Sequence, residues 1–241
     1  MWGFIKDLAG SVWDGLTGTL SSLWNLVTWV IHRVIGLLEL IWSLLGFKPA
    51  KKLRVKVIIL LDAHGQPVAS RADVDAVVTL AKEVFREQAN VRIVSPSGSE
   101  GLIASVHPRP APDYVMNPKC DAGGYAQSFS RPGRWFRRHS ARTPAGAILG
   151  YGAPATIFVV NDVLDKSGCF LGVTTSYGYI DGGALTGSEP QLLTFAHELG
   201  HACDLLHRER TLMAPSSDTR SRRLTHGQRA AMRSSPRVTY L

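Results

Sequence analysis

Cysteine is scarce in this chain, and its odd number leaves at least one thiol without a disulfide partner in the same chain. The 241 residues include only Cys120, Cys169 and Cys203. One disulfide with one free thiol fits an oxidising compartment, whereas three free thiols fit a reducing one. The sequence leaves both the pairing and the compartment open.

The chain also lacks a clear secretory signal and any recognised nucleic-acid-binding motif. Its start carries only Lys6 against Asp7, and no short apolar stretch ends in a small-residue cleavage site. The formal net charge of +8 would attract anionic surfaces or acidic substrates. Without a binding motif, this charge fits anionic lipid or plain solubility better than a nucleic-acid partner. We therefore interpret the basic and aromatic run 131–139 as a solvated loop anchored by one aromatic pair.

Apolar residues crowd the first 47 positions, which contain five of the six tryptophans. Polar and small residues recur there at intervals of three or four, from Asp7 to Ser43, and mark a narrow stripe with a period of about 3.6 residues. We expect residues 1–47 to form a long hydrophobic amphipathic helix or a helical hairpin.

A helix that is apolar over most of its surface must be hidden from water. Residues 23–47 are long enough to span a membrane, but His32, Arg33 and Glu39 near their centre would be costly in hydrocarbon. The alternatives are the membrane interface, self-association in a bundle, a groove in a partner, or packing against the rest of the chain. We expect a membrane-associated protein or part of an assembly, with the side of the membrane left open.

A basic linker at residues 48–52 separates this segment from a second domain at residues 53–241. The expected elements of that domain are strands at 53–62, 91–94 and 155–162, two short strands within 168–181, and helices at 71–88 and within 224–233. Ser70 and Thr225 are the expected caps of the two helices. Strand, helix and strand in succession predict a right-handed crossover and a sheet with helices on it. We expect the fold to be of the α+β class. The stretch 95–152 gives few periodic signals.

The stretch HELGHACDLLH, from His197 to His207, carries the most information about function. It follows an apolar-periodic run and predicts a helix, on which His197 and His201 project from one face. Two imidazoles at that spacing can share one metal ion. Glu198 lies beside them, where it can take a proton from a metal-bound water without acting as a ligand.

The third histidine cannot belong to the same continuous helix. His207 is six residues past His201, and at about 100° per residue it would point to the far side. The helix must therefore end between them, with Asp204 as the expected breaker because Asp tolerates the left-handed conformation. Cys203 points away from the metal-facing side, as a core thiol or as a disulfide partner of Cys120 or Cys169. His226, farther along, is expected at the surface.

His-Glu-x-x-His-x-x-x-x-x-His followed by Met213 in a tight segment resembles the metzincin clan of zinc endopeptidases, whose pattern is H-E-x-x-H-x-x-G-x-x-H with a Met-turn. The resemblance implies that Zn²⁺ is held by His197, His201 and His207. It also implies that Glu198 is the general base and that Met213 lies beneath the metal.

The same resemblance implies the fold and the way a substrate binds. We expect a metzincin-like catalytic domain with a twisted mixed sheet, helices and zinc in the cleft. The strand before the catalytic helix would be an edge that pairs with an extended peptide. Asp204 stands where the pattern has glycine, so either it adopts a positive φ or the turn is built differently.

The expected function is that of a zinc-dependent metalloendopeptidase, which hydrolyses peptide bonds of a peptide or protein substrate through a metal-activated water. Residues 1–47 would target or assemble it. One alternative is a membrane-active or scaffold-assembling protein whose metzincin-like domain is cargo. Another is a catalytically silent zinc-binding module.

Overall fold

The computed structural model describes residues 27, 45–46, 49–101, 103–120, 129–143, 152–170 and 175–240. The helix or hairpin predicted for residues 1–47 lies almost entirely outside these residues, which include only Val27, Leu45 and Gly46 of that segment. Within the described part of the chain, no helix has both the length and the apolar character needed to cross a bilayer.

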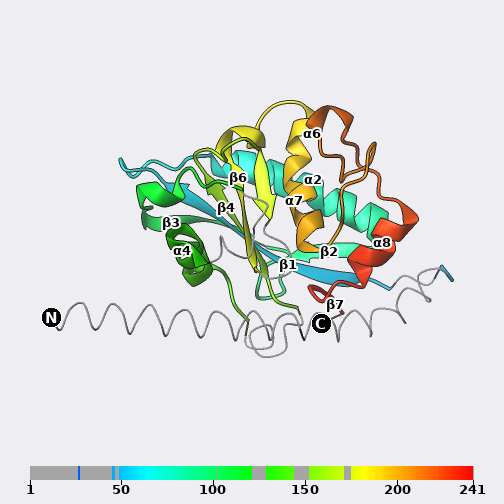
Figure 1. Cartoon of the computed structure of the whole chain (residues 1–241). Helices are drawn as coiled ribbons and strands as arrows, with labels where there is room; N and C mark the ends of the chain where they lie inside the picture. The colour runs from blue at the N-terminus through cyan, green and yellow to red at the C-terminus, as the bar shows by residue number, and fades with distance from the viewer. Residues whose placement is uncertain are drawn as a thin grey trace.

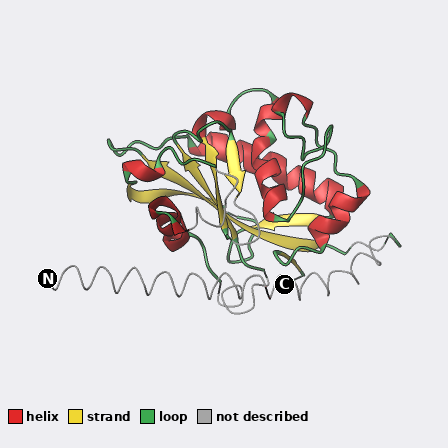
Figure 2. Ribbon diagram, viewed as in Figure 1, coloured by secondary structure: helices red, strands yellow, loops and turns green. Residues whose placement is uncertain are grey.

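A mixed sheet with helices packed on it organises the described residues, as the sequence predicts for an α+β fold (Figures 1 and 2). The strands are β1 (Lys51–Leu61), β2 (Val91–Val94), β3 (Ala104–Pro110), β4 (Ala155–Val160), β5 (Gly168–Phe170), β6 (Tyr177–Asp181) and β7 (Val238–Thr239). The α-helices are α2 (Arg71–Ala89), α4 (Arg131–His139), α6 (Glu189–Leu192), α7 (Thr194–Ala202) and α8 (His226–Arg233). Short 3-10 turns are η1 (Asp113–Val115), η2 (Gly182–Leu185) and η3 (Ser217–Thr219).

The sheet has the order β2-β1-β4-β6-β5, with β3 and β7 also pairing with β1. β1 is parallel to β2, β3 and β4, and β4 is parallel to β6. β7 runs antiparallel to β1, and β5 runs antiparallel to β6. β1 begins at Lys51, inside the range 48–52 that the sequence assigned to a linker. The Lys51 side chain is buried, and its Nζ donates to the carbonyl of Arg233.

Alternate side chains of β1 enter two separate cores, one on each face of the sheet. Val55 and Val57 belong to the larger core, which contains side chains of α2, α7 and α8. Ile58 and Leu60 belong to the smaller one, which contains side chains of α4 and η1. Figure 1 shows α2 and α7 lying together on one side of the sheet. The elements that carry the candidate site therefore pack against the larger core.

The capping predictions are confirmed for the two helices that frame the larger core. The Ser70 side chain accepts a hydrogen bond from Asp73 N at the start of α2. The Thr225 side chain accepts one from Gln228 N at the start of α8. All six residues predicted for the inner face of α2 are buried: Val74, Val77, Val78, Ala81, Val84 and Phe85.

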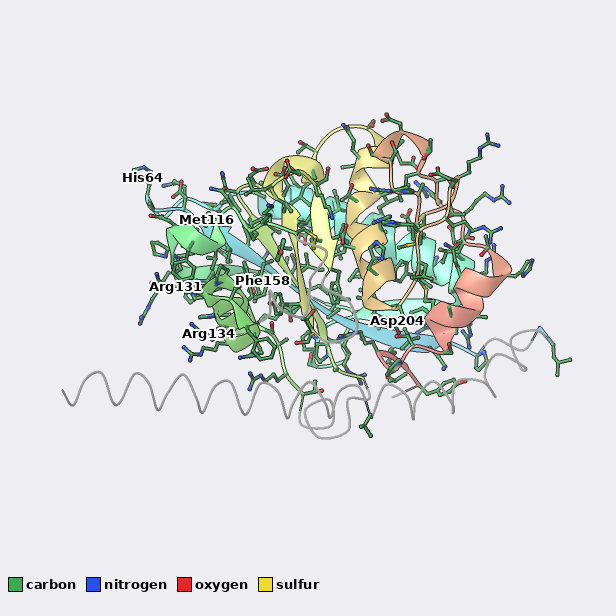
Figure 3. The ribbon with its side chains drawn as sticks, viewed as in Figure 1. His64, Met116, Arg131, Arg134, Phe158 and Asp204 are labelled. Carbon is green, nitrogen blue, oxygen red and sulfur yellow. A yellow bond between two sulfur atoms is a disulfide. The ribbon has the colours of Figure 1, made fainter. Side chains whose placement is uncertain are left out.

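The run 131–139 is a helix, and its interpretation as a loop was wrong. Ser130 caps α4 by accepting a hydrogen bond from Gly133 N, and Phe136 is buried against Phe158 with ring centroids 4.8 Å apart. An aromatic anchor is therefore present, as expected. Figure 3 shows Arg131 and Arg134 on the side of α4 away from Phe158. The arginines gave no apolar period, so the helix was not visible in the sequence.

Candidate metal centre

His197 and His201 lie one turn apart on α7, as their spacing predicts. Their ring centroids are 4.7 Å apart, and their Nε2 atoms are separated by 3.1 Å. α7 packs against the larger core, so that His197 is buried and His201 is partly buried. The apolar side of α7 therefore fixes the direction in which the two imidazoles project.

A left-handed turn at the end of α7 brings in the third histidine. α7 ends at Ala202, and Asp204 follows with φ 64° (Figure 3). Asp204 N donates to the carbonyl of His201 and Leu205 N to that of Gly200, both at 3.0 Å. These two bonds form the Schellman motif, whose left-handed position is usually glycine. The expectation that the helix ends here, with Asp204 as its breaker, is confirmed.

This turn places His207 beside the helix despite its six-residue separation from His201. The two Nε2 atoms are 3.0 Å apart, and the ring centroids of His197 and His207 are 5.3 Å apart. One ligand atom from each of the three histidines lies within 4.8 Å of the others. The three histidines are therefore close enough to bind a single metal ion.

Two backbone carbonyls determine which ring nitrogen is available to that ion. The carbonyl of Leu212 lies 2.9 Å from His197 Nδ1, and the carbonyl of Leu205 lies 2.9 Å from His201 Nδ1. A carbonyl can only accept a hydrogen bond, so each neutral imidazole carries its proton on Nδ1 and its lone pair on Nε2. The two Nε2 atoms are 3.1 Å apart. Because neither carries a proton, they cannot hydrogen-bond to each other, but both can bind one cation.

The electrostatic surroundings keep the imidazoles in the neutral form that binds metal. Burial, helped by the charge of Arg220, lowers the pKa of His197 to about 3. Burial also lowers the pKa of His201 to about 4, with the neighbouring His207 contributing. The pKa of the more exposed His207 is lowered in the same direction, again mainly through loss of solvent. Near neutral pH no proton has to leave His197 or His201 before a metal binds.

The two Nε2–Nε2 distances from His201 agree with a zinc-sized ion. Ligand bonds of about 2.0–2.1 Å at tetrahedral angles place neighbouring nitrogens about 3.3–3.4 Å apart. The Nε2 separations of 3.1 and 3.0 Å are a few tenths of an ångström shorter. Neutral imidazole suits several transition metals, zinc among them. The three histidines therefore fit Zn²⁺ and also fit other divalent transition-metal ions.

Glu198 is buried next to this group but does not belong to it. The ligand cluster contains histidines alone, and the Oε2 atom of Glu198 has no hydrogen-bond partner within the described structure. Burial raises the pKa of Glu198 to about 7, opposed by the charge of Arg220 and by a hydrogen bond from the backbone of Phe170. A buried carboxylate oxygen without a partner is uncommon in a finished core. It is suited to exchanging a proton with a molecule that enters the site.

Strand β5 lies directly against Glu198. Phe170 supplies the backbone hydrogen bond to the carboxylate, and a Cβ added to Gly168 would lie 2.9 Å from Glu198 Cγ and 3.0 Å from its Oε1. Only glycine leaves room for the carboxylate at that point. Neither contact was predicted, because residues 168 and 198 are far apart in sequence and no local pattern links them.

Within the described residues, β5 is the edge of the sheet at this end. The resemblance implied an edge within residues 168–181; of the two strands there, β6 lies between β4 and β5, and β5 forms the edge. β5 pairs only with β6 within the described structure, in antiparallel orientation. The chain forms the edge strand first and returns through the sheet interior before it enters the helix.

Met213 packs under the helix between the two ligands. Its side chain is fully buried, and a Cβ added to Gly200 would overlap its Sδ. The Met213 carbonyl also accepts a hydrogen bond from Arg208 N at 3.0 Å. The segment around Met213 therefore supports both His201, through Gly200, and His207, through its neighbour Arg208.

The structure resolves the cysteine pairing that the sequence left open and confirms the expected surface position of His226. Cys120 and Cys169 form a disulfide with a Cα–Cα distance of 6.0 Å, and Cys203 is buried and forms none. Cys169 is the central residue of β5, so the bridge fastens the edge strand beside Glu198. His226 is exposed at the start of α8 and is not part of the metal-ligand group.

Comparison with known proteins gives no family for this chain. No protein-family model matches it, and no curated protein is significantly similar in sequence. The functional conclusion therefore depends on the geometry and chemistry of the site.

Proposed function

We propose that this chain is a zinc-dependent endopeptidase with a metzincin-like catalytic domain. One observation carries the proposal: three imidazoles cluster within metal-binding distance, and the residue next to His197 is a buried glutamate whose Oε2 has no partner within the described structure. Three neutral histidines are a usual donor set of catalytic zinc sites, which keep one position for water or substrate. A structural zinc site would instead use four protein ligands, and no fourth ligand belongs to the described group.

The residues of the site have separate tasks in this proposal. His197, His201 and His207 bind the metal, and the carbonyls of Leu205 and Leu212 hold two of the rings in position. When bound, zinc would polarise the peptide carbonyl and make a water molecule more acidic. Glu198 Oε2 accepts a proton from the attacking water and returns it to the leaving amine nitrogen.

The edge strand gives the substrate a place to bind. β5 has one side without a strand partner in the described structure and lies against Glu198. An extended peptide added to this edge would be held by backbone hydrogen bonds, whatever its side chains. Such binding would bring a peptide bond of the substrate close to the carboxylate.

Zinc-dependent cleavage of peptides tests this function. The full chain, loaded with one equivalent of zinc, is incubated with a mixed peptide library, and the products are identified by mass spectrometry. We expect internal cleavage that stops on removal of zinc and returns when zinc is added. Zinc binding with no cleavage of any library member would contradict the endopeptidase proposal and favour the catalytically silent zinc-binding module.

A further inference from the structure

Arg220 is a buried cation between the two segments that build the metal site. Its side chain is 9% exposed. Nη1 donates to Thr194 Oγ1 at 2.7 Å, and Nε and Nη2 donate to the carbonyl of Ala214 at 3.4 and 3.5 Å. Thr194 begins α7 one turn before His197, and Ala214 directly follows Met213. The guanidinium is therefore fixed beside the site by contacts with both segments.

The charge of Arg220 has no adjacent counter-ion. No carboxylate of the described residues lies within ion-pair distance of it, and Glu198 is the one anion that raises its pKa, against the larger lowering by burial. The same guanidinium lowers the pKa of Glu198 and of all three histidines. Burying a cation without a hydrogen-bonded anion costs free energy. A role in binding an anion would explain why Arg220 is nevertheless buried here.

The hydrogen bonds leave part of the guanidinium available. Arginine has five N–H donors in a planar fork, and the three hydrogen bonds to Thr194 and Ala214 use one each on Nε, Nη1 and Nη2. One N–H on each terminal nitrogen remains. Guanidinium N–H groups pair well with the two oxygens of a carboxylate.

We propose that Arg220 binds a carboxylate of the substrate, so that the enzyme prefers peptides with an acidic group close to the bond that is cleaved. The proposal rests on the endopeptidase function proposed above. The carboxylate comes either from an aspartate or glutamate side chain or from the C-terminus of a short peptide. Both sources present the same planar anion to the guanidinium.

Arg222, two residues farther along, is the matched control. It is 40% exposed in its side chain and already forms ion pairs with Glu189 at 2.7 Å and Glu83 at 3.5 Å. Arg222 has the same guanidinium group and lies in the same loop as Arg220, but it is at the surface, where two glutamates neutralise its charge. Replacing it should remove one positive charge without changing the preference for substrates.

The test compares matched hexapeptides, designed from the library products, that differ only in Glu or Gln next to the cleaved bond. In one series the C-terminus is amidated, and in the other it is a free carboxylate. For the wild-type protein with zinc we expect kcat/KM to favour the acidic peptide by about 10- to 100-fold. If an internal side chain is the source, the preference appears in the amidated series. If the C-terminus is the source, kcat/KM is higher for peptides with a free C-terminus than for their amidated counterparts.

The Arg220→Gln variant should bring that ratio close to one, Arg220→Lys should leave an intermediate ratio, and Arg222→Gln should keep the wild-type ratio. Each ratio is taken within one variant, so a general loss of turnover cancels. The proposal is overturned if the wild-type Glu/Gln ratio is near one in both series and free and amidated C-termini also give equal kcat/KM; this outcome requires no variant to fold. An unchanged ratio in Arg220→Gln also overturns it.

Binding separates this inference from the proposed function. Fluorescence anisotropy of the labelled Glu and Gln peptides is measured on the zinc-loaded Glu198→Gln variant, alone and combined with Arg220→Gln. Preferential binding of the acidic peptide that is lost with Arg220 supports the carboxylate site even if no peptide is ever cleaved. Equal binding of the Glu and Gln peptides, and of peptides with a free and an amidated C-terminus, contradicts it even if cleavage is found.

Discussion

Replacing Glu198 with glutamine is expected to lower the kcat of peptide hydrolysis by about 10²- to 10⁴-fold, the usual contribution of a general base. Glutamine has nearly the same shape as glutamate, but it cannot accept and return the proton. Because Glu198 is not one of the three metal ligands, the variant should still bind zinc as the wild-type protein does. Steady-state kinetics on a peptide from the library, with the zinc content measured on the same sample, gives both quantities.

Glu100 provides the control for this substitution. It is an exposed glutamate that pairs with Arg92 at 3.6 Å, and Glu100→Gln should leave turnover and zinc content unchanged. A Glu198→Gln variant that keeps more than a tenth of the wild-type kcat would show that another group moves the proton. Loss of zinc together with activity would show instead that Glu198 supports the metal ligands.

Breaking the Cys120–Cys169 disulfide is expected to lower the free energy of unfolding by about 4 kcal/mol, because the bridge closes a loop of 49 residues and restricts the unfolded chain. The effect should reach the proposed catalytic site as well. Cys169 lies in β5 between Gly168 and Phe170, both of which contact Glu198. A loosened β5 would hold the carboxylate less firmly, and turnover should fall with stability.

Urea unfolding of the wild-type protein, with and without a phosphine reductant, measures the change in stability. The Cys120→Ser/Cys169→Ser variant should match the reduced wild-type protein and no longer respond to the reductant. Cys203→Ala, which alters a buried thiol that forms no disulfide, should keep the full response. A difference of less than about 1 kcal/mol on reduction would contradict a stabilising bridge, since native disulfides typically contribute 2–5 kcal/mol.

The parts of the structure that follow local rules were predictable from the sequence. α2 has a serine cap and a regular apolar face, and the candidate metal ligands lie within the single stretch 197–207, where helix geometry fixes the positions of two of them. Even the turn at Asp204 was expected, because the position of His207 requires the helix to end first. In each case the signal lies within a few residues of its effect.

The remaining features depend on residues far apart in the chain. α4 has one fully buried aromatic residue among its arginines, so its stability comes from packing against Phe158 and not from periodicity. The position of β5 at the edge depends on the return of β6 into the sheet. Arg220 belongs to a basic stretch whose arginines look alike in the sequence. Only the contacts of Arg220 with Thr194 and Ala214 in the folded chain distinguish it from the others.

Isothermal titration calorimetry with zinc tests the central claim, that His197, His201 and His207 bind one ion together. We predict one tight site per chain for the metal-stripped protein, and a loss of affinity of at least 100-fold in His207→Ala, which removes the ligand brought in by the turn at Asp204. The control His226→Ala, at an exposed position outside the group, should bind as the wild-type protein does. The account is contradicted if the wild-type chain binds no zinc, or if His207→Ala binds it with unchanged affinity.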